Sequence, residues 1–173
     1  PCVLSALIAN VISSLFGVAS TSFTLAAIPE LSAISLLQAI GLGIVFGALA
    51  SLFCRAMHIG GTLYKKIENP YLRIVVGGCI VALLSLLVRS GDYNGAGMSV
   101  ISAALTGHAV PWAFALKIVF TVLTLGAGFK GGEIVPCFFV GATCGCVVAP
   151  LLGMDAGFGA ALGLIAVFCG VTN

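Results

Sequence analysis

The chain has 173 residues, of which 61% are hydrophobic and only 7% carry a charge, and its formal net charge is +2. A soluble domain carries roughly 25% charged residues, so this composition excludes a soluble enzyme, a nucleic-acid-binding protein and a disordered chain. It predicts an all-α protein of several membrane spans, because only helices and closed barrels satisfy their backbone in lipid and the chain lacks the alternating pattern of barrel strands.

The first half of the chain predicts three helices. The first is expected at about residues 3–16 and the second at 35–57, with a Ser/Thr-rich connection over 20–33 between them. A polar loop is expected over 58–69. Asn69-Pro70, an N-cap followed by proline at the first helical position, then opens a third helix to about Val88. Basic residues flank the 58–69 loop, so the positive-inside rule places it in the cytoplasm and the 20–33 connection outside.

The second half predicts shorter, interrupted helices. A turn-rich break over 89–97 leads to a partial helix over 98–106 that is too short to cross the bilayer. The next helix is expected from Pro111-Trp112 to about Leu125, and a glycine-rich break over 126–132 follows it. The remaining helices are expected at 133–152 and, after an N-cap at Asp155, up to Cys169. The fold class is therefore a polytopic helical bundle with broken and partial helices.

The cysteines and histidines suggest no metal site. Cys144 and Cys146 are close in sequence, but His58 and His108 lie far from them, and zinc needs four nitrogen or sulfur ligands. We interpret the cysteines as packing residues and predict neither a metal nor a cofactor. The chain opens at Pro1 and ends at Asn173 directly beside apolar sequence, so we expect it to be part of a longer chain.

The second break carries the chemistry. A glycine-rich interruption of apolar sequence is tolerated in a membrane only where it is buried in protein or lines a cavity. It leads into a helix whose first amides have no intrahelical partner and whose dipole is positive at that end. We therefore predict that a small anion binds the backbone amides there; a tight interhelical turn without a ligand is the alternative. The predicted anion-binding residues are Gly131, Gly132, Glu133, Ile134 and Val135.

Side chains near this break have competing interpretations. Glu133 is either a favourable charge at a helix start or an ionisable group in an ion path. Lys117 and Lys130 either add positive potential to an anion pathway or reach toward lipid headgroups. The rings of Phe138 and Phe139 either offer their positive edges to an anion or pack between helices.

Residues Gly128 to Ala142 resemble the helix-opening motif of CLC chloride channels and transporters. The variant Gly-Phe-Lys-Gly-Gly-Glu looks like the fluoride-exporting branch of that family. The order and lengths of the predicted helices are similar to helices I to O of its eighteen-helix subunit, built from inverted repeats. On this resemblance, residues 1–30 end the first half-repeat and 31–173 form most of the second. The gating glutamate motif and the late pore tyrosine of the family are absent from the chain.

The resemblance implies an integral, multi-pass protein of the bacterial plasma membrane that exchanges fluoride for protons as a homodimer. A chloride channel or chloride/proton antiporter of the same fold is the first alternative. Chloride-type relatives usually have an apolar residue where Glu133 stands, and Val135 offers no hydroxyl to a strongly hydrated ion such as fluoride. A membrane-embedded enzyme or a structural membrane subunit is the remoter alternative, and we do not expect an enzyme.

Overall fold

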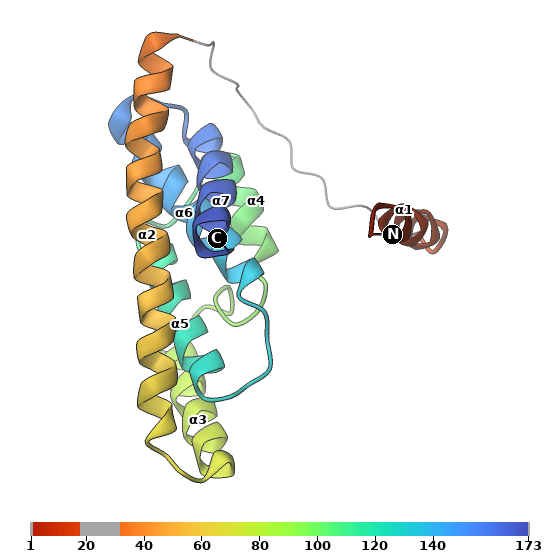
Figure 1. Cartoon of the computed structure of the whole chain (residues 1–173), viewed down its shortest axis with the longest axis vertical. Helices are drawn as coiled ribbons and strands as arrows, with labels where there is room; N and C mark the ends of the chain where they lie inside the picture. The colour runs from red at the N-terminus through yellow and green to blue at the C-terminus, as the bar shows by residue number, and fades with distance from the viewer. Residues whose placement is uncertain (1, 18–31, 173) are drawn as a thin grey trace.

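A computed structural model describes residues 2–17 and 32–172, and every described element is helical (Figure 1). The predicted 20–33 connection lies almost entirely outside these ranges. In chain order the elements are α1 (Cys2–Leu15), α2 (Ala33–Lys65), α3 (Pro70–Val88), α4 (Met98–Leu105), α5 (Ala113–Gly126), α6 (Ile134–Val148), the 3-10 turn η1 (Ala149–Leu152) and α7 (Ala156–Thr172).

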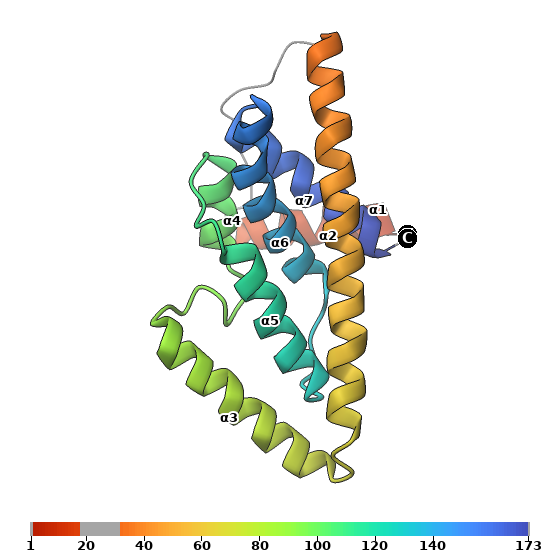
Figure 2. The ribbon, with the colours of Figure 1, turned by 90° about the vertical axis from the view of Figure 1, so that its left-hand side faces the viewer.

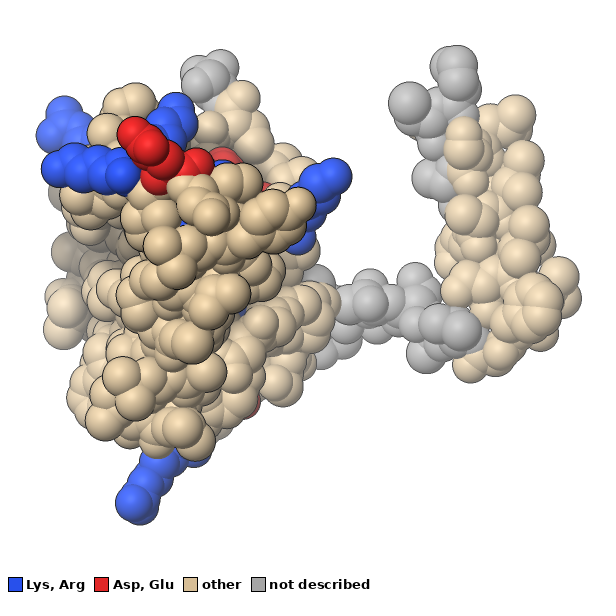
Figure 3. Space-filling model, turned by 90° about the horizontal axis from the view of Figure 1, so that it is seen from below, with Lys and Arg blue, Asp and Glu red and all other residues tan. Residues whose placement is uncertain are grey.

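Within the described residues, three helical stretches are long and apolar enough to cross a membrane: Ala33–Lys65, Pro70–Val88 and Ile134–Leu152. Seen from the end that carries the α2–α3 connection, the surface is mostly uncharged, and acidic and basic side chains occupy only a few places (Figure 3). Both observations agree with the predicted membrane protein.

The two predicted N-caps are confirmed. The Asn69 side chain accepts hydrogen bonds from the amides of Tyr71 and Leu72, at 3.0 and 3.4 Å. The Asp155 carboxylate accepts a 2.9 Å bond from the amide of Phe158. Each cap satisfies amides that a helix start leaves without a partner.

The predicted polar loop over 58–69 is wrong, because α2 continues as a helix to Lys65 and only residues 66–69 connect it to α3. One face of the additional turns is buried: a Cβ on Gly60 would lie 2.3 Å from the Val122 side chain of α5, and Tyr64 is only 8% exposed. His58 lies on the exposed face. Polar residues in this stretch therefore mark the exposed face of a long helix.

The end of the predicted 133–152 helix also differs. The α-helical part stops at Val148, and η1 completes the stretch. Pro150 has no amide to continue the α-helical ladder, so the last turn tightens.

Helix α6 is the centre of the bundle, and α7, α2, α5 and α4 surround it (Figure 2). Its contact with α7 is made by backbone. A Cβ built on Gly141 would lie 2.1 Å from the carbonyl oxygen of Gly163, and one on Gly145 would lie 2.1 Å from that of Gly159. Small residues allow this close approach of two helices in a membrane, and it fixes the axis of α6.

Candidate anion-binding site

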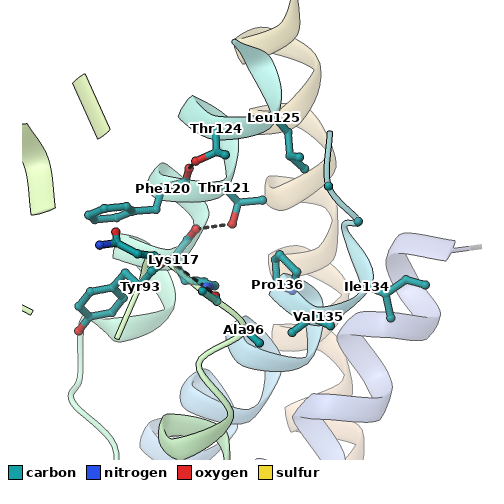
Figure 4. A pocket seen from close by; sticks show the side chains of 14 residues that line it. Tyr93, Ala96, Lys117, Phe120, Thr121, Thr124, Leu125, Ile134, Val135 and Pro136 are labelled. Carbon is teal, nitrogen blue, oxygen red and sulfur yellow. Dashed lines mark hydrogen bonds between the residues drawn. The ribbon is translucent and has the colours of Figure 1, made fainter. Parts of the chain in front are cut away.

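A cavity of about 540 Å³ lies between α5, the start of α6 and the connection between α3 and α4 (Figure 4). The connection contributes residues from Tyr93 to Ala96, and α5 contributes the face that carries Lys117, Thr121 and Thr124. Among the lining residues Lys117 is the one cation, and none is acidic. The wall is therefore mostly apolar with a positive bias.

The predicted amide cluster lies on this cavity. Gly131, Gly132, Ile134 and Val135 all line it. In the described structure none of the amides from Gly131 to Val135 donates a hydrogen bond, and the first bond of α6 runs from the amide of Cys137 to the carbonyl of Glu133, at 3.1 Å. Five successive backbone donors are thus available where the helix dipole is positive.

Glu133 occupies the N-cap position of α6 in a helical conformation, with φ −85° and ψ −14°. Its side chain accepts no capping hydrogen bond and is exposed. It does not line the cavity. Its carboxylate therefore lies in the open, next in sequence to the amides that line the cavity.

Lys117 is buried, with 3% of its surface exposed, and does not extend to an interface. Its ammonium donates to the carbonyl of Tyr93 at 3.0 Å and to the carbonyl of Gly95. It also lies 5.0 Å from the centre of the Phe139 ring. Within the described chain no carboxylate pairs with it, so its charge is compensated only by dipoles and remains as a positive potential beside the cavity.

Two threonines on the cavity wall were missed by the sequence analysis. The hydroxyl of Thr121 donates to the carbonyl of Lys117 and that of Thr124 to the carbonyl of Phe120, both at 2.7 Å. Their spacing of four and seven residues from Lys117 places all three on one face of α5. That periodicity is the signal that could have found them.

The remaining predicted residues lie off the cavity. Phe139 is fully buried and its ring lies 6.0 Å from that of Tyr93, while Phe138 packs against Phe168 at 5.1 Å. Both rings therefore make helix packing contacts. Lys130 is exposed and does not line the cavity.

Comparison with known proteins gives one consistent likeness. A family model described as voltage gated chloride channel matches residues 1–173. A "Chloride/fluoride channel protein" of Pseudomonas syringae pv. tomato is 36% identical over 180 residues, which cover 100% of this chain and 40% of the relative. The "Voltage-gated ClC-type chloride channel ClcB" of Salmonella dublin is 28% identical over a match that covers 88% of this chain and 38% of the relative.

Among solved structures, the "Crystal structure of a CLC-type fluoride/proton antiporter" superposes with a TM-score of 0.90 at 33% identity. The match covers 98% of this chain and 43% of that chain. The helices described above are thus arranged as in part of that antiporter. The chain spans less than half the length of each of these relatives.

Proposed function

The chain belongs to the voltage-gated chloride channel family, and from that premise we propose that it carries an anion-binding site of a membrane anion transporter. The transported ion is fluoride, exchanged for protons. The observation that carries the proposal is the run of five unpaired amides, Gly131 to Val135, at the start of α6 beside a cavity whose one lining charge is positive.

The site suits binding of an ion more than a reaction. Backbone amides at a helix N-terminus hold a small anion without a covalent step, and the apolar wall removes water, which strengthens the electrostatic attraction. Lys117 adds a positive charge to the wall of the cavity. Broken helices that point their N-termini at an anion are a recurring device of transporters.

Fluoride is supported by the names of two relatives at more than 30% identity: both names include fluoride, and only that of the Pseudomonas protein also includes chloride. Glu133 supports this choice, because a carboxylate beside an anion site provides a group that can carry the exchanged proton. The second candidate is chloride transport. It is favoured by the likeness to ClcB and by Val135, whose side chain offers no donor to a strongly hydrated ion.

The same premise supports three further proposals. The chain forms the end of one half-repeat, residues 1–30, and most of the second, 31–173. The protein acts as a homodimer with one anion pathway in each subunit. It works in a bacterial plasma membrane, as the bacterial sources of its relatives suggest.

The test is anion efflux from liposomes that contain the full-length protein as its gene encodes it. Fluoride efflux much faster than chloride efflux, accompanied by proton uptake, is the expected result. Equal rates for both ions would favour the second candidate, and no flux of either ion would reject the proposal.

Glu133 allows a sharper test in the same assay. We expect Glu133→Gln to uncouple proton movement from fluoride movement, since glutamine keeps the shape but cannot carry a proton. Glu68→Gln is the matched control, because Glu68 is an exposed acid in the α2–α3 connection. Unchanged coupling in Glu133→Gln would remove this residue from the mechanism.

A further inference from the structure

Three helices meet where the second break begins. Ala127, the residue that follows α5, is fully buried. Gly77 of α3 lies so close that a Cβ there would be 2.2 Å from the Ala127 Cβ. From α2, the Tyr64 ring lies 3.0 Å from the place of a Cβ on Gly126. The starting point of the break is therefore enclosed by α2, α3 and α5.

Arg73 makes the polar contact of this junction. It is half-buried on the first turn of α3, one helical turn before Gly77, so both face Ala127. Its Nε donates a 3.2 Å hydrogen bond to the carbonyl of Ala127. Another guanidinium nitrogen, Nη2, lies 3.2 Å from the place of a Cβ on Gly128, where φ is +98°. The guanidinium thus lies against Gly128, which has no side chain, and against the carbonyl at the end of α5.

The contact satisfies a need of the backbone. The last carbonyls of a helix have no intrahelical partner and carry its partial negative charge, and a cation that donates to one of them stabilises the helix end. Here the cation comes from another helix, 54 residues earlier in the sequence. It therefore fixes the end of α5 relative to α3 and not only the local turn.

Only three residues separate Ala127 from Gly131, the first residue of the amide cluster. Four residue steps span at most about 14 Å of extended chain. Three of the five residues from 128 to 132 are glycines, which impose little rigidity of their own. The position of the amides is consequently set by what holds the two ends of the break. One end is the start of α6, and the other is the carbonyl that Arg73 holds.

We propose that Arg73 is a positioning residue for the anion-binding amides, acting through the carbonyl of Ala127 and the break that follows it. The proposal rests on the proposed function, since it assigns a role within the same site. Arg73 does not line the cavity, so it acts without touching the anion. Its role differs from that of a basic residue that merely marks the cytoplasmic side of the membrane.

The experiment uses three variants of the full-length protein in liposomes: Arg73→Gln, Arg73→Lys and Lys65→Gln. Lys65 is an exposed cation at the end of α2, so its loss removes the same charge near the same connection without the contact. For Arg73→Gln we expect the KM for fluoride to rise about tenfold with a maximal rate within about twofold of wild type, because small misplacements of binding groups have large effects. Arg73→Lys keeps the charge but not the Nε donor, and we expect an intermediate KM.

Hydrogen–deuterium exchange at the amides of Ala127 and Gly128, which donate to the carbonyls of Leu123 and Leu125 at 3.2 and 3.0 Å, provides a readout independent of transport. We expect faster exchange in Arg73→Gln, a smaller increase in Arg73→Lys and wild-type exchange in Lys65→Gln. Wild-type exchange in Arg73→Gln, or an equal rise of KM in Lys65→Gln, would overturn the proposal. A wild-type protein that moves neither anion would overturn the proposed function and the anion role of Arg73 together, and exchange would then decide only whether Arg73 holds the break.

Discussion

The two ends of α6 are held in different ways. Toward its C-terminal end, the helix packs on α7 through backbone contacts at Gly141 and Gly145, and nearly every side chain from Cys137 to Cys146 is buried. At its N-terminal end, Gly131 and Gly132 are exposed. The segments around that end are held by hydrogen bonds from two cations to carbonyls, Lys117 on one side of the cavity and Arg73 at the start of the break.

The difference shows how a membrane protein can keep backbone donors free without losing its shape. Packing against α7 leaves no space for adjustment and fixes the helix. The side-chain bonds at the other end position the connecting segments by their carbonyls and leave the amides unused. The following variants test this division, from the largest expected effect to the smallest.

Gly145→Ala should have the largest effect, because it disturbs the packing of α6 on α7. Its Cβ would lie 2.1 Å from the carbonyl oxygen of Gly159 and 3.0 Å from the Cα of Ala160, both backbone atoms that cannot rotate away. We expect a loss of about 3 kcal/mol or more, the upper end of overpacking costs, measured as a lower thermal unfolding midpoint and less monodisperse protein in detergent. A wild-type midpoint would mean that the two helices can separate cheaply.

Lys117→Met should disturb the N-terminal end of α6, which borders the cavity. Two carbonyls, of Tyr93 and Gly95, would lose a charged donor, at a cost of about 2 kcal/mol, and the cavity would lose its one lining charge. We expect lower stability and the loss of most fluoride flux. Lys130→Met is the control, because Lys130 is exposed and off the cavity. Equal losses in both variants would show that local charge alone matters.

Gly128→Ala should have an intermediate effect. The φ of +98° is unfavourable for any residue with a Cβ, and an unfavourable positive φ costs roughly 1–2 kcal/mol. The new methyl group would also press on the Arg73 guanidinium. We expect a moderate rise in the KM for fluoride, and a double variant with Arg73→Gln that is less than additive, since both changes act on one contact.

Gly91→Ala, in the α3–α4 connection, is its matched control, because nothing lies within 4 Å of the place of its Cβ, its φ is not positive and it does not line the cavity. We expect little change in stability. If the effects of Gly128→Ala and Arg73→Gln on the KM for fluoride were fully additive, the turn at Gly128 and the Arg73 guanidinium would act independently.

Gly43→Ala should have the smallest effect. Gly43 lies on the exposed face of α2 with nothing within 4 Å of the place of its Cβ. Alanine is the better helix former, so we expect no change or a gain of up to about 1 kcal/mol in unfolding free energy. A clear loss of stability in the full-length protein would reveal that another part of it packs on this face.

Local signals predicted most of the fold. Asn69-Pro70 and Asp155 mark helix starts because a cap and a helix start are features of a few adjacent residues. The glycine run over 126–132 predicted the break between α5 and α6, and the structure confirms it. The length of α2 was missed because burial of Gly60 against α5 is a tertiary contact that the sequence pattern does not contain.

The candidate site divides in the same way. The free amides follow from the local rule that a helix start leaves its donors unpaired. The contacts of Lys117 with Tyr93 and of Arg73 with Ala127 join residues 24 and 54 positions apart. Their partners are main-chain carbonyls, which every residue has, so no side-chain motif could indicate them.

The fixed ammonium of Lys117 has a consequence for speed. Two carbonyls and the face of Phe139 contact it, so its position is set by the protein before an anion arrives. The field in the cavity is then already oriented, and no dipole has to reorganise at that moment. For the anion site proposed above, the cost that such an oriented field leaves in place is dehydration of the ion, so we expect entry to depend on how easily the ion loses water.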